Sequence, residues 1–208
     1  IIYWGAVHRV IDAPHLSSLL STFSVNMIII GIGTAVFSTS FRNVDYSLGI
    51  VTIGPITVPG TRFTSALLAL GITGLLYLFL YRTRPGKYVR AVSDNRTSAG
   101  LMGIASNRVL ALSFGLGTML AALAGGLIAM ALPFTILSGG SYELKSFVIV
   151  VLGGLGNPIG ALLGGVILGL IEGLVPVFTK ITWVPVIEFV LFVLILLVRP
   201  QGLFGAKQ

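Results

Sequence analysis

Two glutamates, Glu172 and Glu188, are the residues of this sequence whose chemistry most needs an explanation. Both fall inside long apolar segments, where a charge costs about 2.5–3.5 kcal/mol on insertion scales. An ionisable side chain at such depth is a candidate for a transport pathway or an ion site. The structural alternative is that each lies near a helix end and meets the headgroup region, and the sequence favours neither. Asn26 is a weaker candidate, whose expected role is a hydrogen bond between helices.

The remaining residue types do not assemble a catalytic site. The sequence has no cysteine, and its two histidines, His8 and His15, both lie in the leading segment. A metal cluster cannot be built from that inventory. The glycines near Lys87 and around Leu155 match neither the phosphate-binding loop nor the dinucleotide fingerprint. We therefore expect a chain that is not an enzyme and that carries no cofactor of its own.

Membrane helices must position the two glutamates. Of the 208 residues, 55% are hydrophobic and only 9% are charged, against about 25% charged in soluble domains. Such a chain cannot cover itself with polar surface, which predicts an all-α integral membrane protein folded as a polytopic helical bundle. A span needs about 20 mostly apolar residues. The segments that meet this requirement are 16–37, 63–81, 109–132 and 183–198.

Residues 146–174 form a fifth apolar segment, which glycines and a proline interrupt between Gly153 and Pro158. The halves are 146–152, which is too short to span, and 159–174. This pattern predicts a broken or re-entrant Gly-rich element followed by a full helix. Two β-prone runs around Gly54 predict a small β-hairpin outside the membrane, and we expect residues 133–143 to form a short external loop.

The basic residues indicate the orientation. Six of the 13 lysines and arginines lie within residues 82–108, between two apolar spans, as the positive-inside rule predicts for a cytoplasmic loop. Together with Arg9, Arg199 and Lys207, nine basic residues are expected inside. Four are expected outside: Arg42, Arg62, Lys145 and Lys180. This distribution explains the net charge of +7 without nucleic acid, and it places the C-terminus in the cytoplasm.

Small residues recur at four-residue spacing in the last third of the chain. Such rows let helix backbones approach closely in lipid, so we expect helix packing rather than a direct role in a pathway. The two rows on the fifth apolar segment are Gly156, Gly160 and Gly164, and Gly165, Gly169 and Gly173.

Residues 82–108 are longer and more polar than a simple turn requires. Ser93 or Asp94 is a suitable N-cap for a short helix, and Gly103 can end it. The helix has an apolar side made of Ala99, Leu101, Met102 and Ile104. The helix either docks into a groove on another protein or lies on anionic lipid with the help of nearby arginines. Composition alone leaves both interpretations open.

Several ordered motifs resemble the permease subunits of branched-chain amino acid ABC transporters, and the LivH-like type more closely. They lie at residues 84–91, 99–104, 112–126, 151–160, 164–169 and 199–205, so the resemblance covers nearly the whole chain. It implies a single transmembrane permease domain over 1–208, with a cytoplasmic coupling loop at 82–108. Family members are longer and carry additional N-terminal helices, so we expect that such helices are missing here.

The resemblance implies partners and a location in the cell (inner or plasma) membrane. A second permease subunit, identical or homologous, would complete the pore. Two ATP-binding cassette subunits would bind ATP and Mg, and an extracytoplasmic protein would deliver branched-chain amino acids or related solutes. The residues expected to couple the permease to the ATPases are Arg90, Ala91, Asp94, Ala99, Leu101, Gly103 and Ile104.

The competing hypothesis is an ion-coupled secondary transporter or channel subunit. In that case Glu172 or Glu188 would bind the coupling ion near the membrane midplane. The two hypotheses differ in the source of energy, which is ATP in the first and an ion gradient in the second.

Overall fold

The computed structural model describes residues 15–44, 48–54, 56–154, 156–199 and 202. The expectations for His8, Arg9, Lys207 and most of the terminal motif at 199–205 lie outside these residues. The chain divides into two compact units, Ile1–Leu137 and Ser138–Gln208, and each is described by itself.

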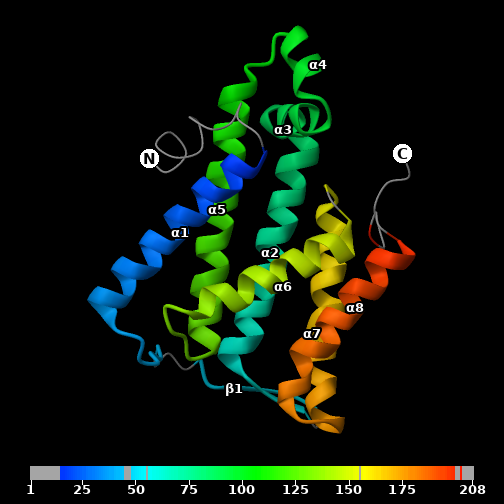
Figure 1. The fold of residues 1–208 in the computed structure, drawn as a ribbon. Coiled ribbons are helices and arrows are strands. Elements are labelled where there is room, and N and C mark those ends of the chain that lie inside the picture. Colours follow the sequence, from blue (N-terminus) through cyan, green and yellow to red (C-terminus); the bar gives the residue numbers. More distant parts are fainter. Residues whose placement is uncertain (1–14, 45–47, 55, 155, 200–201, 203–208) are drawn as a thin grey trace. The chain divides into compact units, whose positions relative to one another are not determined.

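Three long helices dominate the N-terminal unit (Figure 1). They are α1 (His15–Phe37), α2 (Gly60–Arg82) and α5 (Ser106–Ala131), and all three are long and apolar enough to cross a membrane. Their bounds confirm the first three predicted spans to within a few residues. Ser106 begins α5 after the N-cap residue Ala105, and no side chain caps this helix.

The predicted hairpin is present between α1 and α2. Strand β1 (Ile50–Ile53) pairs with β2 (Ile56–Pro59) in antiparallel register, Val51 opposite Val58. Gly54 has a φ of +61°, a left-handed conformation that glycine adopts without steric cost. The chain enters α2 directly from β2, where the Gly60 amide donates to the Gly49 carbonyl at 2.8 Å.

Residues 82–108 fold into two helices rather than one. Helix α3 (Arg84–Asp94) begins after Thr83, whose side chain accepts a hydrogen bond from the Gly86 amide. A Cβ at Gly86 would collide with the backbone of Phe79 and Leu80, so this glycine lets α3 pack closely against the end of α2. The sequence did not reveal α3, because its residues are mostly polar.

Helix α4 (Arg96–Leu101) follows after a single residue. Asn95 is its N-cap, with the side-chain oxygen accepting from the Ser98 amide at 2.9 Å. The predicted caps are therefore wrong: Ser93 and Asp94 belong to the last turn of α3.

The C-terminal unit contains α6 (Ser138–Gly153), α7 (Pro158–Phe178), a 3₁₀ turn η3 (Ile181–Trp183) and α8 (Val184–Val198). Helix α7 and the segment Ile181–Val198 are long and apolar enough to span, as predicted. Helix α6 starts eight residues before the predicted 146, so half of the expected external loop 133–143 is helical. At 16 residues it rises about 24 Å, less than the hydrocarbon thickness of about 30 Å.

The predicted break separates α6 from α7. Gly154 and Gly156 have φ values of +90° and +82°, which reverse the chain. The Asn157 side chain then caps α7 by accepting from the amides of Ile159 and Gly160, both at 3.1 Å. Gly202 is buried beside this break, where a Cβ would collide with the Val151 carbonyl and with Gly154.

The two predicted glycine rows differ within this unit, and Gly156 lies in the break before α7. Gly160 and Gly164 are buried, and a Cβ at Gly164 would lie 2.9 Å from the Ile149 carbonyl oxygen of α6. By contrast, a Cβ at Gly169 or Gly173 would meet no atom within 4 Å. Helix packing inside the unit therefore uses the row that contains Gly164.

Candidate functional sites

The first candidate site is the end of α4. The Ile104 amide donates to the Ala99 carbonyl at 3.1 Å, and the Gly103 amide donates to the Gly100 carbonyl at 3.0 Å. These two bonds form the Schellman motif, which requires a left-handed residue at Gly103, and the φ of that residue is +81°. Gly103 therefore ends the helix, as predicted, and its role is a backbone one.

The Schellman turn exposes two large apolar side chains. Leu101 is 87% exposed and Met102 is 84% exposed, the highest values among the exposed large hydrophobic residues of the described chain. Ala99 is only 5% exposed, so it packs α4 inside the unit and is not available for a direct contact. Of the other expected coupling residues, Ala91 and Asp94 are exposed and Ile104 is partly buried.

Arg90 is fixed against the end of α2. Its Nε donates to the Leu80 carbonyl at 3.2 Å, and its guanidinium lies 4.3 Å from the centre of the Tyr81 ring. Arg96 of α4 makes a similar hydrogen bond to α5, where it donates to the Asn107 side chain at 3.1 Å. These bonds attach α3 to the end of α2 and α4 to the start of α5.

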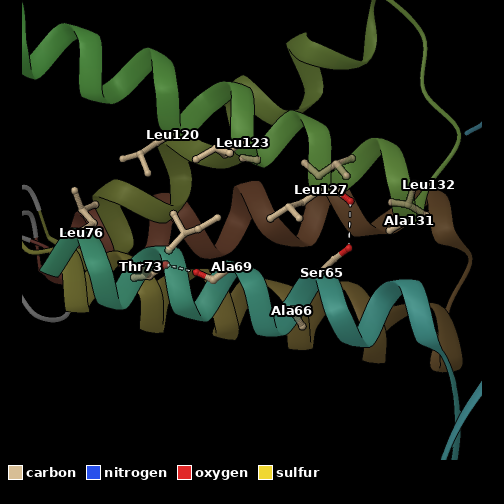
Figure 2. A pocket seen from close by; sticks show the side chains of 13 residues that line it. Ser65, Ala66, Ala69, Thr73, Leu76, Leu120, Leu123, Leu127, Ala131 and Leu132 are labelled. Carbon is tan, nitrogen blue, oxygen red and sulfur yellow. Dashed lines mark hydrogen bonds between the residues drawn. The ribbon is translucent and has the colours of Figure 1, made fainter. Parts of the chain in front are cut away.

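A groove of about 520 Å³ lies between α2 and α5 in the same unit. Figure 2 shows Leu120, Leu123 and Leu127 of α5 facing α2, where Ser65 donates to the Leu127 carbonyl. The lining residues are apolar apart from Ser65 and Thr73. The Thr73 hydroxyl donates a hydrogen bond to the Ala69 carbonyl of its own helix at 2.8 Å. The groove therefore offers no charged partner for a zwitterionic solute.

The second candidate site lies in the C-terminal unit and includes both glutamates singled out from the sequence. Lys145 of α6 pairs with Glu172 of α7, with Nζ 2.5 Å from Oε1. Glu188 of α8 is buried and only 6% exposed. Glu172 thus has a partner inside the protein, and whether either glutamate lies at the depth of the headgroups stays a prediction. Lys145, expected in or beside an external loop, is a helical residue that pairs with a spanning helix.

Asn26 lies partly buried on α1, and its hydrogen bond between helices stays a prediction. Sequence reasoning missed Lys145 as a site residue, because its partner is 27 positions away. The signal that was available is that Lys145 and Glu172 are both charges in apolar surroundings, and such charges tend to pair with one another.

Within the part of the chain that the structure describes, five helical segments are long and apolar enough to cross a bilayer, which defines a multi-pass membrane protein. The family model for the permease component of branched-chain amino acid transport systems matches residues 3–198. The chain therefore belongs to this permease family.

Three relatives illustrate the match. The chain is 37% identical over 137 residues to the high-affinity branched-chain amino acid transport system permease protein LivH of Escherichia coli, covering 64% of this chain and 44% of the relative. It is 37% identical over 136 residues to BraD of Pseudomonas aeruginosa, with the same coverage. The probable LivH of Methanocaldococcus jannaschii is 27% identical over 206 residues, covering 90% of this chain and 63% of the relative. The chain thus spans less than half the length of the first two relatives. No solved structure gives a significant match.

Proposed function

We propose that this chain is part of the membrane-spanning permease subunit of an ATP-driven importer for branched-chain or related amino acids. The observation that carries the proposal is the family match over residues 3–198. The relatives are named as permease proteins of branched-chain amino acid transport systems, which favours a transport subunit over an enzyme. ATP and Mg would be bound by two separate ATPase subunits. A second permease subunit would complete the pore, and an extracytoplasmic protein would deliver the solute.

The end of α4 supports a docking role for the loop 82–108 on the cytoplasmic side. An exposed apolar pair on a short, well-capped helix suits a shallow groove on a soluble partner, since burial of apolar side chains drives association. The contact surface would consist of Leu101 and Met102, with Ala91, Asp94 and Ile104 nearby. Ala99 supports this surface from inside, and Gly103 fixes its backbone.

A site-specific cross-link tests this docking. These 208 residues contain no cysteine, so Leu101→Cys, in a full-length permease from which any cysteine elsewhere has been replaced, provides a unique thiol at the exposed position. We expect it to cross-link to the ATPase subunit, with a yield that changes when ATP is added, because nucleotide-driven closure would move α4.

The matched control is Ala99→Cys, two residues away on the same helix but buried. We expect little cross-linking from this position. A Leu101 thiol that reacts only with lipid-phase reagents, with the ATPase present and folded, would show that α4 lies on the membrane surface and would contradict the docking proposal.

A further inference from the structure

The C-terminal unit holds a cluster of three charged side chains that the proposed coupling to ATPases does not use. Lys145 lies on α6, Glu172 on α7 and Glu188 near the start of α8. The Lys145 ammonium pairs with Glu172 at 2.5 Å, and it also interacts electrostatically with Glu188. The cluster therefore brings two carboxyl groups to a single ammonium group.

Glu188 is the member whose environment is incomplete. Its side chain is 6% exposed, and among the described residues its Oε1 has no hydrogen-bond partner. An ionised carboxylate only accepts hydrogen bonds, and a buried acceptor without a donor is unfavourable. Glu188 also interacts electrostatically with Glu172 and with Lys145, so the Lys145 ammonium offsets the repulsion between the two carboxyl groups. The Oε1 of Glu188 therefore lacks a donor among the described residues.

The cluster can be reached from the surface of its unit. The side chains of Lys145 and Glu172 are 31% and 36% exposed, whereas Glu188 is only 6% exposed. A ligand that displaces the lysine ammonium would therefore meet the more exposed Glu172 carboxylate, and the unpartnered oxygen of the buried Glu188 would be its second acceptor. Lysine has a long, flexible side chain with three donors on its ammonium group, so it can move aside without unfolding α6.

We propose that Glu172 and Glu188 form a binding site for a primary ammonium group, and that Lys145 is its resident occupant in this structure. An amino acid carries the same ammonium group, so substrate and lysine compete for one pair of carboxylates. The inference rests on the proposed function for one point, that the incoming ammonium is that of a transported amino acid. The lysine released by this exchange is free to pair with the carboxylate of the solute.

The test uses the complete transporter, purified in detergent without its substrate-binding protein. The probe is radiolabelled leucine in equilibrium dialysis, with two competitors that each lack one charge. 3-Methylbutylamine keeps the ammonium group of leucine, and 4-methylpentanoate keeps its carboxylate. We expect the amine to compete with leucine and the acid to compete at least tenfold less well.

Two variants separate the ammonium site from a structural role. We expect Glu188→Gln to weaken binding of the amine at least tenfold, because a neutral amide loses the charge-assisted hydrogen bond. We expect Lys145→Met to tighten it several-fold, because the resident competitor is gone. A misfolded variant cannot produce this second result. Glu143→Gln, an exposed glutamate on α6, is the control and leaves the affinity unchanged.

Three results would overturn the inference. They are an absence of leucine binding to the wild-type transporter at millimolar concentration, equal competition by amine and acid, and an affinity that Glu188→Gln leaves unchanged. An affinity unchanged in Glu188→Gln is the result expected if the two carboxyl groups share a proton, because glutamine mimics the neutral acid. ATP-driven leucine uptake by the wild-type protein is measured separately, so a failed site and a failed proposed function are distinguished.

Discussion

Helix α7 contains two glycines whose replacement by alanine separates helix packing from helix propensity. Gly164 lies against α6, whereas Gly169 lies five residues further along α7 with no atom within 4 Å of the position of an added Cβ. Gly164→Ala and Gly169→Ala therefore add the same methyl group to the same helix. They differ in what that methyl group meets.

The magnitude follows from the contacts at each position. In both variants alanine lowers the conformational cost of helix formation by about 0.5–1 kcal/mol relative to glycine. At Gly164 the Cβ would lie 2.9 Å from the Ile149 carbonyl oxygen and 3.2 Å from Leu152 Cδ2. A backbone atom cannot rotate away, so α6 and α7 must move apart, and overpacking of this kind costs about 1–3 kcal/mol. We expect Gly164→Ala to be less stable than Gly169→Ala by about 1–3 kcal/mol.

The free energy of unfolding of both variants can be measured by titrating the full-length permease with SDS in mixed micelles and following its circular dichroism. We expect the SDS concentration at the unfolding midpoint to be lower for Gly164→Ala than for the wild type. For Gly169→Ala we expect this midpoint at or above the wild-type value. Equal midpoints would refute the reasoning, because they would show that α6 and α7 do not depend on close approach at Gly164. A loss of stability only in Gly169→Ala would show that the other glycine row makes the important contact.

Three further predictions concern single caps and turns. Asn157→Ala should lower the stability of the C-terminal unit by about 1 kcal/mol, because the amides of Ile159 and Gly160 lose their acceptor; thermal unfolding in detergent checks this, and an unchanged midpoint would argue against the cap. Gly103→Ala should destabilise the end of α4 by about 1–2 kcal/mol, because alanine at positive φ is strained. Gly100→Ala, inside α4, should instead stabilise the helix by about 0.5–1 kcal/mol. Hydrogen exchange at the Ile104 amide reports both effects, and a change of the exchange rate in the same direction for both variants would contradict the assignment. Asn95→Ala should cost about 1 kcal/mol by removing the N-cap of α4, with faster exchange at the Ser98 amide as the readout and unaltered exchange as the contrary result.

The sequence predicted the spanning helices well, because hydropathy depends on local composition and a bilayer requires a fixed length. The hairpin was also predictable, since Gly54 lies between two β-prone runs and adopts a positive φ. Gly103 was recognised as a helix terminator for the same kind of local reason.

The features that the sequence did not predict depend on contacts between residues that are distant in the chain or on the position of a helix boundary. Helix α3 is polar and carries no spanning signal, and its place at the end of α2 relies on Gly86 packing against a neighbouring backbone. Ser93, Asp94 and Asn95 are all acceptable caps by residue type, and the helix boundary alone decides among them. Lys145 and Glu172 meet only because α6 and α7 pack together, so their pairing was not visible in the sequence.

The energy source of transport is the most direct test of the proposed function. The full-length permease would be reconstituted in proteoliposomes with its ATPase subunits and its binding protein, and leucine uptake would be followed with ATP on the side that α4 faces. We predict uptake that requires ATP, persists when ionophores collapse the ion gradients, and stops when the ATPase is replaced by a variant unable to hydrolyse ATP. Uptake that ionophores abolish and that the inactive ATPase leaves unchanged would contradict the account and identify an ion-coupled transporter.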